Sequence, residues 1–258
     1  MRRGGHALVT GAAGAIGGAI AAELRARDAA ARLSLVDLDE AGARRQAEAL
    51  GGDAAPFRWD LSAPAELDAH LARLGAERGG VDLLVNCAGL MEVRSLAATP
   101  WSLAERLLRI DLESPLKLMA ALVPGMVERG SGAVVNVASM AGVTPLRGCS
   151  YYGAAKAGLA MASEIAHLEL GPRGVRVVTV YPGPVRSALE RRARGQYVDS
   201  PWSRFVPAGD PSALARRVVD ACERGAPRVV YPGFYDLASR FPTWASRAAR
   251  ALCPPPRD

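Results

Sequence analysis

Short apolar runs alternate with longer segments of helical periodicity along most of the chain. Apolar runs bounded by turn residues predict strands buried on both faces, whereas apolar positions three and four residues apart predict helices with one buried side. The predicted strands cover residues 6–10, 33–36, 57–59, 81–85, 133–138, 175–181 and 228–231. The predicted helices cover residues 16–27, 40–50, 64–74, 104–123, 152–170 and 211–223.

This alternation is typical of an α/β fold with a doubly wound parallel sheet of the Rossmann type, in which helices cover both faces and make three layers. A single domain over residues 1–258 is expected, because half of the residues are hydrophobic and can fill one large core. Periodicity is lost from Pro182 to Asp210, which predicts a long loop, with about 184–209 as a substrate lid. A basic tail at about 234–258 is expected to dock within the protein or its oligomer, with peripheral membrane contact as the alternative.

The loop between the first predicted strand and helix, Thr10-Gly11-Ala12-Ala13-Gly14-Ala15-Ile16-Gly17, has the composition of a phosphate-binding turn. Backbone N–H groups at a helix N-terminus attract a pyrophosphate, and glycine leaves room for it. Glycines also serve in plain tight turns, but their place between strand and helix favours a dinucleotide site.

Asp37 ends the second predicted strand, at the interval beyond Gly17 where a carboxylate meets the adenosine ribose. Such a carboxylate repels a 2′-phosphate, so NAD is expected in preference to NADP. Arg44 and Arg45 follow closely in sequence and leave NADP open, and Asp37 as the start of a turn is the plainer alternative.

Tyr152 and Lys156 are one helical turn apart and are expected on the same helix face. An ammonium beside a phenol lowers the phenol pKa from about 10 toward working pH, which makes the tyrosine a usable acid and base. Ser139 ends the preceding strand and is placed to hydrogen-bond a substrate oxygen. By itself the pair would more often be an exposed one, and Tyr151 lacks a lysine four residues later.

These segments together resemble the short-chain dehydrogenase/reductase family, in its short single-domain branch, over nearly the whole chain. The matching segments are Thr10 to Gly17, Asp60-Leu61, Asn86-Cys87-Ala88-Gly89, Ser139, Tyr152-Gly153-Ala154-Ala155-Lys156, and Pro182-Gly183 with Val185 and Ser187. The resemblance implies hydride transfer between NAD(H) and a secondary alcohol or ketone. It also implies a homodimer or homotetramer that pairs through the helices carrying Asp111 and Tyr152.

The resemblance implies a role for each matching residue. Ser139 would orient the carbonyl, Tyr152 would protonate it, and Lys156 would hold the nicotinamide ribose. The implied catalytic residues are Ser139, Tyr152, Lys156 and Asp111. The implied cofactor-binding residues are Gly11, Ala13, Gly14, Ile16, Gly17, Asp37, Asp60 (adenine), Leu61, Asn86, Ala88, Gly89, Tyr152, Lys156, Pro182, Gly183, Val185 and Ser187 (carboxamide).

Three positions depart from the family pattern. Ala15 gives the loop a spacing like that of the extended branch with its sugar-nucleotide epimerases, although too few residues follow Lys156 for a substrate domain. Cys87 replaces an asparagine. Asp111 stands where the family has an asparagine, so a buried carboxylate near Lys156 is expected to weaken the lysine's effect on Tyr152. The alternatives are a structural Asp111, an NAD-binding sensor or scaffold with impaired catalysis, or an epimerase or dehydratase.

The residues that the family resemblance puts on the substrate side are apolar, which favours a hydrophobic ketone or alcohol as substrate. These expected residues are Leu90, Met91, Met140, Val143, Leu146, Tyr181, Pro184, Trp202 and Phe205; several of them would otherwise complete the core. Arg186, Arg191, Arg192 and Arg194 of the lid suit an anionic handle or, more simply, a solvated basic face.

Charge and cysteine usage narrow the remaining classes. The net charge of +6 comes from scattered arginines without a recognition motif, so a nucleic-acid partner is not expected. The four cysteines form no metal-ligand or disulfide pattern, which favours no metal and a cytoplasmic location. No apolar run is long enough for a transmembrane segment.

Overall fold

One parallel sheet of seven strands forms the centre of the protein, in the order β3-β2-β1-β4-β5-β6-β7. The computed structural model describes residues 4–199, 207–236 and 241–257. The strands are β1 (Gly5–Thr10), β2 (Ala30–Asp37), β3 (Asp53–Arg58), β4 (Leu83–Asn86), β5 (Gly132–Val137), β6 (Val175–Pro182) and β7 (Arg228–Tyr231). Strand order reverses between β1 and β4, and ligands of such sheets bind beyond the strand carboxyl ends at this point.

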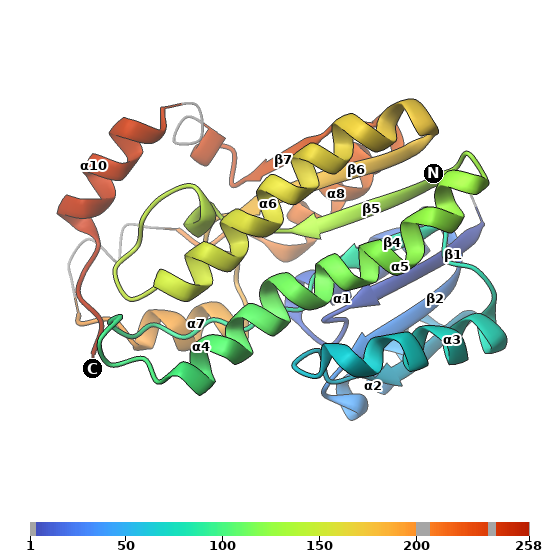
Figure 1. Cartoon of the computed structure of the whole chain (residues 1–258), viewed down its shortest axis with the longest axis horizontal. Helices are drawn as coiled ribbons and strands as arrows, with labels where there is room; N and C mark the ends of the chain where they lie inside the picture. The colour runs from blue at the N-terminus through green and yellow to red at the C-terminus, as the bar shows by residue number, and fades with distance from the viewer. Residues whose placement is uncertain (1–3, 200–206, 237–240, 258) are drawn as a thin grey trace.

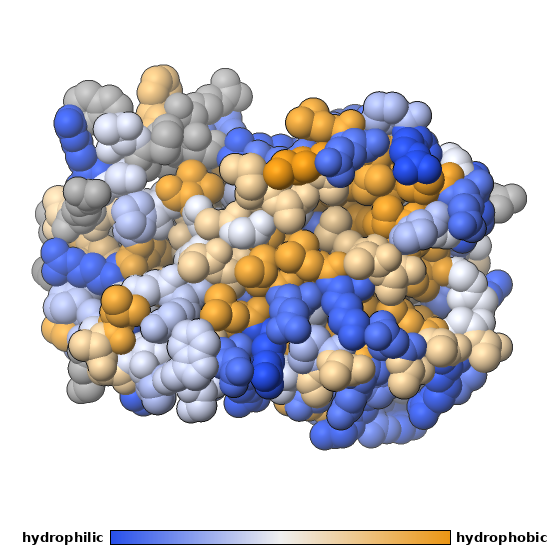
Figure 2. Space-filling view, in the orientation of Figure 1, coloured by the Kyte–Doolittle hydropathy of each residue, from blue (hydrophilic) through white to orange (hydrophobic). Residues whose placement is uncertain are grey.

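Helices cover both faces of the sheet (Figure 1). One layer holds α1 (Ala15–Ala26), α2 (Glu40–Leu50) and α8 (Pro211–Arg224). The other holds α3 (Leu67–Arg78), α5 (Ser114–Glu128) and α6 (Ser150–Leu170). α4 (Trp101–Leu108) runs through a π-helical turn, Arg109–Glu113, directly into α5. The face with α5 and α6 carries a band of apolar side chains along its middle (Figure 2).

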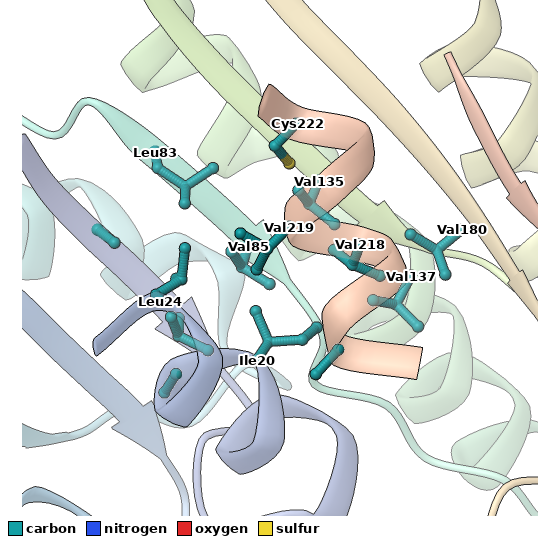
Figure 3. Packing of buried hydrophobic residues seen from close by; sticks show 14 of the residues in the cluster. Ile20, Leu24, Leu83, Val85, Val135, Val137, Val180, Val218, Val219 and Cys222 are labelled. Carbon is teal, nitrogen blue, oxygen red and sulfur yellow. The ribbon is translucent and has the colours of Figure 1, made fainter. Parts of the chain in front are cut away.

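Alternate strand residues belong to different cores. Val9 of β1 packs in the cluster under α1 and α8, whereas its neighbour Leu8 packs in the cluster under α3 and α5. Val85 and Leu84 of β4 divide in the same way. Figure 3 shows residues of α1 and α8 that enclose the valines of β4, β5 and β6. Burial of both strand faces explains why these strands are continuous apolar runs.

The predicted doubly wound sheet is confirmed, with differences at its edge and in one helix. β3 begins at Asp53 rather than at residue 57, because this edge strand contains Pro56 and small residues that hide its pattern. The helix predicted at 104–123 is interrupted by the π-helical turn and continues past Pro124 to Glu128.

The prediction of an irregular loop over the whole lid is wrong, because residues 188–195 form helix α7 (Ala188–Gly195). Ser187 caps it, Glu190 pairs with Arg194 at 2.6 Å, and only Ala193 of its side chains is buried. A helix with so little apolar surface has no hydrophobic periodicity to detect.

The chain ends beside this helix. After α10 (Pro242–Leu252), residues 255–257 run antiparallel to 196–198, with Val198 N–H donating to the Pro255 carbonyl at 3.0 Å and Arg257 N–H donating to the Gln196 carbonyl at 2.7 Å. In Figure 1 the C-terminus therefore lies near α7. The helical character predicted to Leu252 is confirmed. Among the described helices, none is both long and apolar enough to cross a bilayer.

Candidate active site

The loops that follow β1, β4 and β5 meet at the carboxyl edge of the sheet. Thr10 joins two of them: its hydroxyl accepts from the N–H groups of Cys87 (3.0 Å) and Ala88 (3.1 Å) and lies 3.3 Å from the Val85 carbonyl. Gly11 has a φ of +68°, and a Cβ there would lie 2.8 Å from the Cα of Ala88. The loops after β1 and β4 thus approach each other as closely as a glycine permits.

The N-terminus of α1 has the properties of a phosphate site. A Cβ on Gly17 would lie 2.3 Å from the Gly11 carbonyl oxygen, so the turn closes only with glycine. The N-cap residue is Gly14, which has no side chain to bond the first N–H groups of the helix. The first turn of α1 holds no acidic residue. The free N–H groups and positive helix end fit the pyrophosphate of a dinucleotide. Ala15, the departure in this loop, is exposed and leaves this arrangement intact.

Asp37 lies beside this loop at the end of β2. Its carboxylate accepts from the N–H groups of Ala13 and Asp39, each at 3.0 Å. Of the two arginines that left NADP open, Arg44 pairs with Glu40 at 2.9 Å. Arg45 lies 3.8 Å from Asp39. Each of the two arginines therefore has a carboxylate of the chain within 4 Å.

Asp60 and Leu61 follow β3. The carboxylate of Asp60 accepts from the Ser62 hydroxyl at 2.7 Å and from its N–H at 2.8 Å, and these bonds lower the pKa of Asp60. Leu61 packs in the core under α3, and its carbonyl accepts from the Ser114 hydroxyl at 2.7 Å. The side chain of Leu61 is therefore part of the core, and its carbonyl is already bonded within the chain.

Asn86 braces the sheet through a buried amide network. Its Nδ2 donates to Oδ1 of Asn136 at 2.8 Å, and Asn136 Nδ2 donates to the Ser163 hydroxyl at 2.6 Å. This network joins β4, β5 and α6. Asn136 and Ser163 were not predicted from the sequence, although an asparagine inside the valine run of β5 was a signal that a buried partner exists.

The residues expected to react come together at the start of α6. Tyr152 and Ser139 are each 8% exposed, and Lys156 is 4% exposed. The Lys156 Nζ lies 5.9 Å from the centroid of the Tyr152 ring and donates to the Val137 carbonyl at 3.0 Å. The Ser139 hydroxyl accepts from the Ala141 N–H at 3.1 Å. The structure thus brings the predicted serine, tyrosine and lysine into one buried cluster.

Asp111 is also part of this cluster, through its side chain. It is fully buried in the π-helical turn, and its Oδ1 lies 3.1 Å from the Lys156 Nζ. The N–H of Leu90 donates to the same carboxylate at 3.2 and 3.3 Å. A Cβ on Gly89 would lie 2.9 Å from Oδ1, so the glycine makes room for the carboxylate. π-Helical turns of this kind are frequent at functional sites.

Burial and the ion pair both shift the ionisation of these groups. Burial raises the pKa of Asp111 to about 6, while Lys156 opposes this shift. Burial opposes the charged form of Lys156, but the Asp111 carboxylate, together with Tyr152 and Cys87, outweighs burial, and the pKa of the lysine is raised. Burial raises the pKa of Tyr152, Lys156 and Ser139 lower it, and Asp111 raises it further.

Two apolar clusters lie beside Tyr152 and Ser139. Met91 and Leu146 pack with Tyr152, as do Val93 and Tyr197, which were not predicted. Met140, Val143 and Tyr181 form the second cluster with Val230 and Tyr235. Leu90 and Pro184 are half-buried in the neighbouring loops. Trp202 and Phe205 lie outside the described residues.

Three of the four lid arginines that the structure describes form ion pairs within the chain. Arg186 pairs with Asp210 at 2.6 Å, Arg192 pairs with Glu92, and Arg194 pairs with Glu190, while Arg191 is exposed.

Residues 183–187, between β6 and α7, are fixed by contacts within the chain. Ser187 accepts from the Glu190 N–H at 3.0 Å, Val185 pairs with Gly209, and the Tyr235 ring packs against Gly183, which follows Pro182. The lid is therefore anchored at both of its described ends.

Comparison with known proteins places this arrangement in a family. The model of the short chain dehydrogenase family matches residues 5–197. D-threitol dehydrogenase of Mycolicibacterium smegmatis is 35% identical over 209 residues, which cover 79% of this chain and 78% of that protein. The 3-oxoacyl-[acyl-carrier-protein] reductase of Vibrio cholerae is 32% identical over 82% of this chain and 87% of its own.

A solved structure supports the same assignment. The short-chain dehydrogenase from Sphingobium yanoikuyae in complex with NADPH superposes with a TM-score of 0.81 at 27% identity, over 96% of this chain and 95% of that one. The chain therefore belongs to the short-chain dehydrogenase family, as a nicotinamide-dependent oxidoreductase that acts on CH–OH groups.

Proposed function

We propose that this protein transfers a hydride between NAD(H) and an apolar secondary alcohol or ketone, with Tyr152 as the general acid and base. The observation that carries the proposal is the buried cluster of Ser139, Tyr152 and Lys156 at the carboxyl edge of the sheet. The apolar clusters around Tyr152 and Met140 favour an apolar substrate.

Each residue has a distinct task in this mechanism. A nicotinamide bound here would supply or accept the hydride. Ser139 donates a hydrogen bond that orients the substrate oxygen, and the Tyr152 O–H gives its proton to that oxygen during reduction. In the reverse direction the Tyr152 phenolate takes the alcohol proton. Two of the three N–H donors of Lys156 bond to Val137 and Asp111, so one donor is left for a ribose hydroxyl.

The further cofactor roles follow the same placement. Gly11, Gly14, Ile16 and Gly17 would hold the pyrophosphate at the N-terminus of α1, and Asp37 with Ala13 would hold the adenosine ribose. Three carboxylates gather here, on Asp37, Asp39 and Glu40; Arg44 and Arg45 pair with two of them, and Arg58 lies opposite Asp37 on β3. The Asp37 carboxylate supports NAD in preference to NADP, because it repels a 2′-phosphate.

The family resemblance supplies the remaining cofactor contacts of this proposal. They would be Asp60 and Leu61 at the adenine, Asn86, Ala88 and Gly89 beneath the ribose, and Pro182, Gly183, Val185 and Ser187 at the carboxamide.

The test is turnover with a panel of compounds, followed by absorbance of NADH or NADPH. The panel contains D-threitol, galactitol, a 3-oxoacyl thioester and bulky apolar ketones. Tyr152→Phe is expected to lower kcat by about a hundredfold or more, because general acid–base catalysis contributes on this scale. Tyr151→Phe is the matched control, since Tyr151 packs edge-on to Trp101 rather than beside the lysine. Full activity of Tyr152→Phe would refute the mechanism. NADH binding without turnover of any compound would instead favour a sensor or scaffold.

We also propose a homo-oligomer formed through the outer faces of α5 and α6. Met161, Ile165 and Leu168 share one side of α6 and are 60%, 47% and 74% exposed. Figure 2 shows a band of apolar side chains over the outer side of α5 and α6. Ile165→Glu with Leu168→Glu is expected to yield monomers in size-exclusion chromatography with light scattering. An unchanged mass would remove this interface. The free cysteines are compatible with a cytoplasmic location, which we propose on that ground.

A further inference from the structure

We propose that the buried carboxylate of Asp111 neutralises the ammonium of Lys156 and keeps the Tyr152 phenol protonated to a higher pH than the lysine alone would allow. Asp111 is then a positioning residue that sets the working pH of this site. The inference rests on the proposed role of Tyr152 as the general acid and base.

The ion pair is closed to solvent and held in place from several sides. The side chains of Lys156 and Asp111 are 5% and 0% exposed, and their charged atoms are 3.1 Å apart. The N–H of Leu90 and the carbonyl of Val137 hold the two ends of the pair. Gly89 closes over the carboxylate without room for a side chain. Water and salt therefore screen this pair far less than an exposed one.

The other groups around the phenol do not replace this effect. Tyr152 faces Lys156 on its own helix, Asp111 on the π-helical turn, the Ser139 hydroxyl after β5 and the Cys149 thiol at the start of α6. Lys156 faces Asp111, Tyr152 and the Cys87 thiol. Burial raises the pKa of Cys87 to about 12 and that of Cys149 to about 11, so both thiols are neutral at working pH. Asp111 is the one carboxylate among these described neighbours.

The consequence for Tyr152 follows from charge alone. The Lys156 Nζ lies 5.9 Å from the centroid of the Tyr152 ring. A cation about 4–6 Å from an acid lowers the pKa of that acid by about one to three units, and a carboxylate in contact with the cation cancels much of its field. Alcohol oxidation needs the phenolate, so its rate should keep rising into alkaline pH. Ketone reduction needs the phenol, so it should persist to the same high pH. The pH profiles of oxidation and reduction both report the ionisation of Tyr152, so they must shift together.

Asp111→Asn tests this inference directly, because the substitution removes the charge and keeps the shape and an oxygen for the Leu90 N–H. In the cofactor-free protein, the near-ultraviolet absorbance of phenolate is titrated against pH, and the same curve for Tyr152→Phe is subtracted to isolate Tyr152. The Tyr152 midpoint is expected about one unit or more lower in Asp111→Asn than in the wild type. A Tyr152 signal that moves by less than a few tenths of a unit, or appears in neither protein, overturns the inference.

The pH profile of catalysis gives a second readout. The alcohol of the panel that the wild type oxidises fastest is used, and the acid limb of kcat/KM is expected to move down by the same amount. Asp68→Asn is the matched control: it removes the same charge from an exposed pair, 3.0 Å from Lys117 on the surface, and should leave the profile unchanged. If no compound is turned over, the proposed function fails while the spectroscopic titration still decides the inference. If turnover is normal but the limb stays in place, only the inference fails.

Discussion

Gly11→Ala is expected to damage this protein more than an ordinary glycine substitution, because two costs act at one position. The first is backbone conformation, since Gly11 has a φ of +68°. The second is space, since the new Cβ would lie 2.8 Å from both the Cα and the N of Ala88. Those are backbone atoms of a loop held by Thr10, so they cannot rotate away as the end of a flexible side chain would.

Gly130 supplies a control that carries only the first cost. It has a φ of +61°, and nothing lies within 4 Å of the position that a Cβ would take there. A left-handed conformation costs a non-glycine residue about 1–2 kcal/mol, which is the loss expected for Gly130→Ala. Overpacking a rigid site adds about 1–3 kcal/mol, so Gly11→Ala should lose about 2–5 kcal/mol.

Thermal unfolding followed by circular dichroism measures this difference. For a chain of this size about 1 kcal/mol corresponds to about 2–4 °C, so the Tm of Gly11→Ala should fall clearly below that of Gly130→Ala. NADH binding, followed by its fluorescence, should weaken in Gly11→Ala and remain normal in Gly130→Ala. Equal Tm values for the two variants, with equal NADH affinity, would refute the argument from close approach.

Three further outcomes are expected. Asp37→Ser with Leu38→Arg should raise the ratio of NADPH to NADH kcat/KM by about tenfold or more, as measured by initial rates, and an unchanged ratio would contradict the role of Asp37. Ending the chain at Leu252 removes the two backbone hydrogen bonds to residues 196–198 and should raise KM by about tenfold, whereas an unchanged KM would mean that α7 does not need the tail. Burial lowers the pKa of His6, so the free energy of unfolding should fall as pH drops below the unfolded value of about 6.5. Denaturant titrations should show a weaker fall in His6→Gln, and an equal fall would assign it to other groups.

The sheet and most helices were predictable because their signals are local. The strand β4 begins with a continuous apolar run and β6 is rich in valine, and the glycine loop lies between a strand and a helix whose patterns differ clearly. Tyr152 and Lys156 were predictable as a pair because one helical turn separates them. Helix α7 was missed because its stability comes from the Ser187 cap and a surface ion pair rather than from an apolar stripe.

Contacts between distant segments gave no such signal. The Glu92 carboxylate binds Arg192 and Gln196 of the lid, and Gln196 Oε1 accepts from the Val93 N–H at 2.9 Å. Each of these polar residues resembles an ordinary surface residue in the sequence. Their meaning depends on which segments the fold brings together.

The sequence by itself determined the alternation of strands and helices, the glycine-rich loop after β1 and the pairing of Tyr152 with Lys156 on one helix face, because each depends on residues close together in the chain. The family resemblance put Asp111 near Lys156, but only the tertiary structure decided that its carboxylate contacts the lysine directly, 3.1 Å away in a closed site. A π-helical turn, a glycine and a buried lysine from three separate segments must converge to place that charge. Its effect on Tyr152 depends on distance and exclusion of water, which no local pattern of residues encodes.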